Sequence, residues 1–79
     1  MALSLRRIRP ERRERRFYRM EVISDLFGTV LLLRTWGRIG TDGRERREVF
    51  ADRQAAAAAL DRLAAAKRRR GYVEVGRTQ

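Results

Sequence analysis

The alternation of apolar and polar positions predicts strands over the first two thirds of the chain. In residues 16–24, Tyr18 and Met20 fall on one side of an alternating pattern, and charged residues are mixed into the other side. Because successive side chains of a strand point to opposite faces, this pattern predicts a strand with one buried face. Residues 29–40 begin with an apolar run and predict a second strand. Residues 44–50 predict a third, joined to the second by a turn that contains an Asp-Gly pair.

A helix is predicted from Asp52 to Gly71. Asp52 is a favourable N-cap, the run of five alanines has high helix propensity, and Gly71 is a favourable residue just after a helix. One face is lined at helical spacing by Ala56, Ala59, Leu60, Leu63 and either Ala66 or Lys67. Residues 72–75 predict a short final strand.

This order of elements predicts an α+β fold, a small twisted antiparallel β-sheet with one α-helix packed on one face. Residues 1–14 are dense in arginine, contain Pro10 and have little to bury, so we expect a flexible basic N-terminal arm. The folded domain is expected over residues 15–76, followed by a C-terminal tail over residues 77–79.

The composition removes most of the residues that catalysis uses. The 79 residues include no cysteine and no histidine. A disulfide, a thiolate nucleophile and a cysteine-based zinc site are therefore impossible, and the usual acid–base group near neutral pH is absent. We expect no enzyme activity, no metal and no cofactor. No stretch approaches the roughly 20 apolar residues of a membrane span, so we expect a cytoplasmic location and no membrane partner. Nothing in the sequence requires a dimer, so we expect a monomer.

The charge points to a polyanionic partner. Twenty basic residues face ten acidic ones, and all the basic residues except Lys67 are arginine. The arginine side chain matches phosphate oxygens in pairs. Nucleic acid is therefore the first expected partner, and an acidic protein or an acidic membrane surface the second. The competing explanation is that the arginines reflect a GC-rich genome and a solvated surface.

The sequence RTWGRIGTDG, residues 34–43, is the main candidate site. Its three glycines do not form a phosphate-binding loop, because no Lys-Ser/Thr pair follows them and the segment joins two strands. Arg34, Trp36 and Arg38 alternate, so they share one face of the strand. An aromatic ring between two guanidinium groups suits a nucleotide, and Gly37 leaves the backbone bare beside the ring. A core position for Trp36 is the structural alternative.

The same residues carry a resemblance to a known family. Trp36-Gly37-Arg38 follows FYRMEV and DLFGTVLLLR and precedes an alanine-rich helix that ends in KRRRGY. This order resembles the WGR domain over about residues 15–75. The resemblance implies an antiparallel sheet with a helix against it. In the DNA-dependent poly(ADP-ribose) polymerases this domain binds DNA near a strand break.

The resemblance also implies roles for two residues. In those polymerases the motif tryptophan packs on the sugar and base of the terminal nucleotide, and the motif arginine contacts the nearby DNA. Trp36 and Arg38 would take these roles here. The polymerases also carry a catalytic domain that the 79 residues do not contain, so break recognition does not transfer automatically.

The sequence therefore predicts a DNA-binding module, with a preference for strand breaks or 5′ termini as a hypothesis. The expected contact residues are Arg34, Trp36, Gly37, Arg38, Lys67, Arg68, Arg69 and Arg70. The run of residues 67–70 suits phosphate contact or complementation of the helix dipole. An RNA-binding domain and a module that docks a separate protein remain the alternatives.

Overall fold

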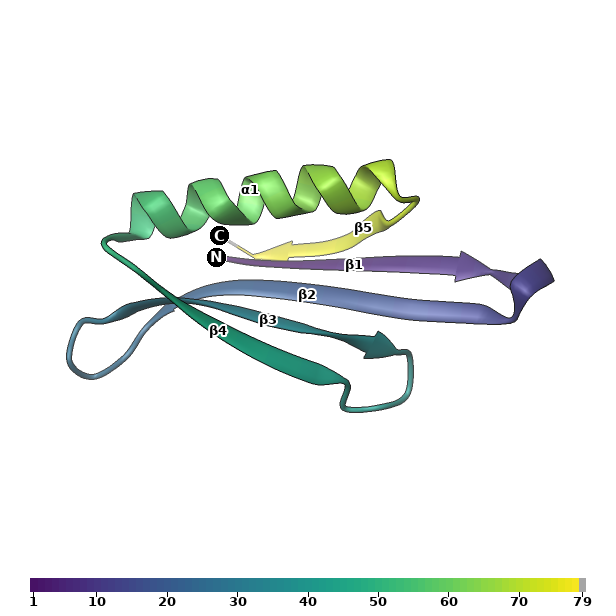
Figure 1. The fold of residues 1–79 in the computed structure, drawn as a ribbon, viewed down its shortest axis with the longest axis horizontal. Coiled ribbons are helices and arrows are strands. Elements are labelled where there is room, and N and C mark those ends of the chain that lie inside the picture. The colour runs from purple at the N-terminus through teal and green to yellow at the C-terminus, as the bar shows by residue number, and fades with distance from the viewer. Residues whose placement is uncertain (79) are drawn as a thin grey trace.

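The computed structural model describes residues 1–78, which form a five-stranded antiparallel sheet and one α-helix (Figure 1). The strands lie in the order β4-β3-β2-β1-β5, so the sheet is open with β4 and β5 at its edges. The prediction of an α+β domain with an antiparallel sheet and one helix is confirmed. The elements are β1 (Ala2–Arg9), the 3-10 turn η1 (Pro10–Arg12), β2 (Glu14–Ser24), β3 (Val30–Arg38), β4 (Arg44–Phe50), α1 (Arg53–Arg69) and β5 (Val73–Thr78).

The prediction of a flexible arm over residues 1–14 is wrong. Residues 2–9 form β1, which pairs with β2 on one side and with β5 on the other. Leu3 and Leu5 are completely buried in the core. The apolar alternation of this strand is short, because it consists only of LSL at residues 3–5 and arginines follow directly. Its two buried leucines hold the strand against the core.

The predicted tail is also wrong where the structure describes it. Arg77 and Thr78 continue β5 and pair with Leu3 and Ala2 of β1. The last residue of the predicted tail, Gln79, lies outside the described residues. The folded domain therefore includes both ends of the described chain, and the boundaries 15–76 are too narrow.

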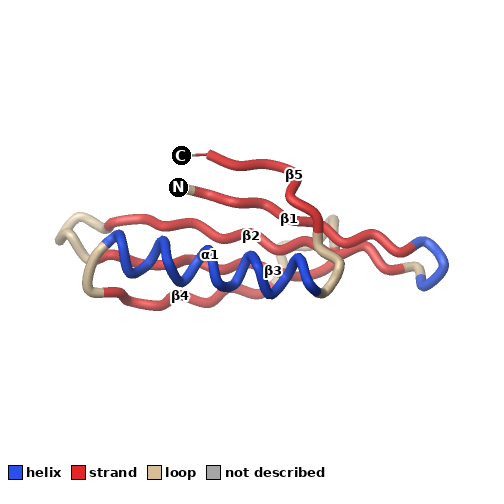
Figure 2. The backbone as a smooth tube through the Cα atoms, turned by 90° about the horizontal axis from the view of Figure 1, so that it is seen from above, coloured by secondary structure: helices blue, strands red, loops and turns tan. Residues whose placement is uncertain are grey.

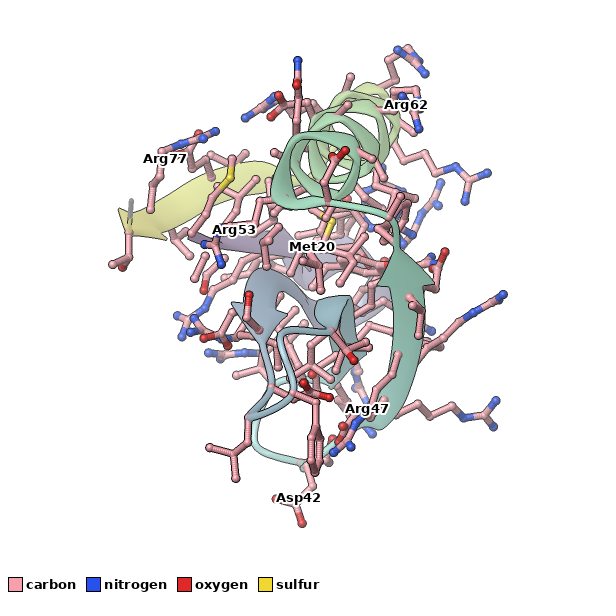
Figure 3. The ribbon with its side chains drawn as sticks, turned by 90° about the vertical axis from the view of Figure 1, so that its left-hand side faces the viewer. Met20, Asp42, Arg47, Arg53, Arg62 and Arg77 are labelled. Atoms are coloured by element: carbon pink, nitrogen blue, oxygen red, sulfur yellow. The ribbon has the colours of Figure 1, made fainter. Side chains whose placement is uncertain are left out.

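The helix lies over β2, β3 and β4 and leaves β5 beside it uncovered (Figure 2). The side chain of Asp52 caps α1 by accepting a hydrogen bond from the Ala55 amide at 2.8 Å. Small buried residues such as Ala56 bring the helix close to the sheet. Met20 is completely buried and lies between helix and sheet (Figure 3).

One core connects the sheet and the helix. Its buried members are Leu3, Leu5, Tyr18, Met20, Val22, Val30, Leu32, Ala56, Ala59, Leu60, Ala64 and Tyr72. In the described part of the chain, no helix is both long and apolar enough to cross a bilayer.

The burial of β1 predicts a large loss of stability for Leu5→Ala. Truncating a fully buried leucine removes apolar contacts and leaves a cavity, so the free energy of unfolding should fall by about 2–5 kcal/mol. Urea denaturation followed by circular dichroism measures this change.

Ile8 supplies the matched control in the same strand, because its side chain is 51% exposed. Ile8→Ala should change the free energy of unfolding by about 0.5 kcal/mol or less. Equally small effects of both substitutions would contradict the placement of β1 in the core.

Candidate nucleic-acid interface

Three arginines form a row across the sheet at the C-terminal end of α1. Arg7 of β1 is opposite Arg16 of β2, which is opposite Arg38 of β3. Each is two positions from a residue in or beside the core, namely Leu5, Tyr18 and Trp36. All three arginines are therefore on the sheet face turned toward the helix, here called the inner face. The hairpin of β1, η1 and β2 extends beyond the helix at this point (Figure 1). The arginine row is therefore where the inner face leaves the cover of α1.

Trp36 lies in the next row, at the border of the core. Its ring is stacked on that of Tyr18, with centroids 5.9 Å apart and planes inclined by 19°. Tyr18 is buried, whereas Trp36 is only partly buried. The tryptophan therefore packs against the core with one side and remains available with the other, which combines the two alternatives that the sequence left open.

Arg34 holds this aromatic pair in place. Its Nε donates a hydrogen bond to the Tyr18 hydroxyl at 2.7 Å, and its Nη1 donates to a carboxylate oxygen of Glu48 at 2.7 Å. The guanidinium carbon lies 5.9 Å from the centroid of the Trp36 ring. Burial alone would lower the pKa of Arg34, but the hydrogen bonds to Glu48 and Tyr18 outweigh it and raise the pKa. Arg34, predicted as a ligand contact, is thus engaged inside the protein.

Gly37 also has an internal reason to be glycine. A Cβ at Gly37 would lie 2.8 Å from the Cα of Gly43, which is the last residue of the connection between β3 and β4. The bare backbone that the sequence offered to a ligand is therefore occupied by the chain itself. Gly37 and Gly43 allow the two ends of the hairpin to approach each other directly behind Trp36.

Arg38 is exposed and, unlike Arg34, is not bound to other side chains of the described residues. Within residues 1–78, its guanidinium makes no hydrogen bond or ion pair. It borders a hollow of about 320 Å³ together with η1 and the start of β2. The lining residues are Arg12, Arg13, Glu14, Arg15, Arg16 and Arg38. Five of these six residues are arginines and one is acidic, so the hollow is suited to an anion.

The four basic residues at the end of α1 divide into different environments. Lys67 places its Nζ 4.3 Å from the centroid of the Tyr18 ring, as a cation over an aromatic face. Arg68 pairs with Glu74 at 3.1 Å. Arg69 and Arg70 are exposed. The four predicted contact residues therefore differ in their surroundings, and Lys67 lies at the aromatic residues of the core border.

Lys67 has a perturbed pKa. Burial lowers it, and repulsion from Arg70, Arg34 and Arg7 lowers it further. The carbonyl of Arg70 accepts hydrogen bonds from Arg7 and Arg9 at 3.0 and 3.2 Å, which draws these arginines to the helix end. Lys67, Arg7 and Arg70 therefore lie close together beside the aromatic pair, and Arg7 also forms an ion pair with Glu14.

Arg7 and Arg16 were not among the contact residues expected from the sequence. Both were assigned to the flexible arm or its border, as part of a general positive charge. The signal that could have placed them is the alternation from Leu3 and Leu5 to Arg7, which sets the face of β1. In the described part of the chain, no cluster of acidic residues could hold a metal ion.

Comparison with known proteins identifies the family of this chain. The family model described as the WGR domain matches residues 1–79. The chain belongs to the WGR family. Its motif residues Trp36, Gly37 and Arg38 end β3 at the border between the core and the basic surface. In the poly(ADP-ribose) polymerases the WGR domain is a nucleic-acid-binding module.

Two longer proteins are similar to this WGR chain. The uncharacterised protein y4dW of Sinorhizobium fredii (strain NBRC 101917 / NGR234) is 40% identical over 70 residues, which cover 89% of this chain and 34% of that protein. A crystal structure of a protein from Bacteroides fragilis has a TM-score of 0.79 and 24% identity, covering 96% of this chain and 20% of that one. The chain thus spans about a third of the first relative and a fifth of the second.

The close approach behind Trp36 predicts that Gly43→Ala is destabilising. A Cβ at Gly43 would collide with the Trp36 carbonyl oxygen and the Phe17 ring, and φ at Gly43 is +72°. Left-handed backbone costs a non-glycine residue about 1–2 kcal/mol, and the collision adds to this. The free energy of unfolding should therefore fall by about 2 kcal/mol or more. Thermal and urea unfolding measure the change.

Gly76→Ala is the control for glycine replacement, because a Cβ at Gly76 meets nothing within 4 Å. Its effect should stay within about 0.5 kcal/mol. An equally small effect of Gly43→Ala would contradict the packing of the motif hairpin.

The cation group predicts the titration of Lys67. Because the chain contains one lysine, ¹³C-lysine labelling gives a single side-chain NMR signal, and its midpoint should lie below the ordinary lysine pKa. Arg70→Gln removes a repulsion that disfavours the protonated form, so the midpoint should move upward. Arg69→Gln, which changes the same charge elsewhere on the helix end, should move it less. A midpoint unaffected by Arg70→Gln would contradict the proposed repulsion.

Proposed function

We propose that this WGR domain binds DNA at the end of the inner face that α1 leaves uncovered, and that it prefers a duplex terminus with a 5′ phosphate. The observation that carries the proposal is the pair of exposed arginines Arg16 and Arg38, which lie opposite each other on β2 and β3 and follow the row that holds the partly buried Trp36. Guanidinium groups bind phosphates, and a planar aromatic side packs on a sugar or base.

The arrangement supports a terminus better than a continuous duplex. Trp36 is held from behind by Tyr18 and Arg34, so it offers a fixed flat surface to the end of a base stack. Arg38, two residues after Trp36, borders a hollow together with Arg16, and the phosphate of the terminal nucleotide would lie there. A continuous duplex has no exposed terminal nucleotide for the ring to pack against.

The residues then have distinct roles in the proposal. Trp36 packs on the terminal nucleotide, and Arg38 with Arg16 binds its phosphates. Arg34 positions the tryptophan and does not itself contact DNA. Arg69 and Arg70 contribute attraction at longer range, which salt screens.

The proposal predicts that sealing the ends of a duplex weakens binding. Fluorescence anisotropy compares a duplex with a 5′-phosphorylated end and a duplex of the same sequence closed by hairpins. Arg38→Ala removes one charged phosphate contact, so it should weaken binding to the open end roughly tenfold or more. It should also make the log–log salt dependence shallower by about one unit.

Arg47→Ala is the control for loss of one arginine. Arg47 is exposed on β4 on the side of the sheet away from the helix (Figure 3), and its removal should leave the preference for the open end unchanged. Equal binding of both duplexes, with equal effects of the two substitutions, would contradict the proposal and indicate general attraction by charge. Stronger competition by single-stranded RNA than by duplex DNA would favour the RNA-binding alternative.

A further inference from the structure

Lys67 differs chemically from every other basic side chain in the protein. The remaining 19 basic residues are arginines, whose guanidinium groups stay protonated and do not act as nucleophiles toward aldehydes. A lysine amine does so when it is neutral, and forms an imine with a carbonyl compound. The position of this one side-chain amine therefore carries chemical meaning beyond its charge.

The amine lies at the proposed DNA surface. Its Nζ is 4.3 Å from the centroid of Tyr18 and 5.6 Å from that of Tyr72. Tyr18 is in turn stacked on Trp36. The other amine of the chain, the α-amine of Met1, is at the opposite end of β2, where the Met1 carbonyl accepts a hydrogen bond from Val22 at 2.8 Å.

The surroundings favour the reactive form of this amine. Aromatic rings on two sides reduce its contact with water, and Arg7, Arg34 and Arg70 disfavour a further positive charge. Burial next to other cations is a known way to activate a lysine as a nucleophile. Arg70, one of the arginines that repel the ammonium group, is exposed and would also attract the phosphates of the bound strand.

We propose that Lys67 captures DNA that carries an abasic deoxyribose, by forming an imine with the C1′ aldehyde of the opened sugar at the border of Trp36 and the arginine row. The inference rests on the proposed function, since DNA must first occupy this surface. A sugar without a base would leave room for its aldehyde to approach Tyr18 and Tyr72, beside which the amine lies.

The chemistry needs no further reagent. The Nζ lone pair forms a bond to C1′ while the carbonyl π bond breaks and its oxygen takes a proton, giving a carbinolamine. Nitrogen then loses a proton and the hydroxyl group leaves as water as the C=N bond forms. One water is released in total, no atom is oxidised or reduced, and hydrolysis reverses the reaction. The result is a reversible covalent capture of the damaged strand.

Borohydride trapping tests this inference. A 5′-phosphorylated duplex with one abasic aldehyde near its end is incubated with the protein and sodium cyanoborohydride, which reduces an imine to a stable amine. Denaturing gels measure the adduct, and mass spectrometry of the digested product maps it. The same duplex with a tetrahydrofuran sugar, which has no aldehyde, measures binding alone by anisotropy.

The expected result is an adduct on Lys67 that falls by more than roughly tenfold in Lys67→Arg at saturating protein, because the positioned amine is lost. The double variant Arg53→Lys/Lys67→Arg keeps the composition and net charge but moves the amine to the start of α1. It should trap no more adduct than Lys67→Arg.

Three results would overturn the inference while leaving the proposed function intact. They are binding of the tetrahydrofuran duplex without any adduct on the aldehyde duplex, an adduct on Met1 instead of Lys67, and equal trapping by the double variant. Absence of binding to either duplex would overturn the proposed function and this inference together.

Discussion

The bridge from Arg34 to Tyr18 and Glu48 determines where the core of this protein ends and its binding surface begins. An arginine on the inner face would be costly among apolar side chains, but here its hydrogen bonds go to the Tyr18 hydroxyl and the Glu48 carboxylate. The bridged guanidinium supports the stacked pair of Tyr18 and Trp36. One side of Trp36 is thereby fixed, and a rigid aromatic surface results without complete burial.

The difference in length between the helix and the sheet exposes this surface. A helix of 17 residues is about 26 Å long at 1.5 Å per residue. The 11 residues of β2 extend about 37 Å at 3.4 Å per residue. The inner face therefore continues past the helix by roughly 10 Å. The side chains there change from leucine and methionine to arginine, since no apolar layer lies above them.

The sequence predicts much of the fold because most elements have a local signal. Alternation identifies β2, while the Asp52 cap and alanine run identify α1, and both agree with the structure. β1 was not predicted as a strand, because its apolar part is only LSL and arginines follow directly. Its strand is stabilised by pairing with β2 and β5, and this depends on contacts distant in sequence that local patterns do not encode.

The site is less predictable than the fold for the same reason. The alternation of Trp36 and Arg38 on β3 is visible in the sequence, and the resemblance to the WGR family draws attention to both. The pairing of Arg16 with Arg38 depends on the register of the β2–β3 hairpin. The use of Arg34 as an internal bridge depends on Glu48 of β4, and the contact of Lys67 with Tyr18 depends on where the helix ends.

The intrinsic fluorescence of Trp36 tests the central claim most directly, because it is the only tryptophan in the chain. The protein is titrated with a 5′-phosphorylated open duplex and, separately, with the hairpin-sealed duplex, while anisotropy of a labelled strand reports occupancy. If Trp36 packs on the terminal nucleotide, its emission should be quenched saturably as the open duplex binds, and much less at equal occupancy by the sealed duplex. Full occupancy by the open duplex without any change in Trp36 emission would contradict this contact, and would place the DNA on a part of the surface away from the motif.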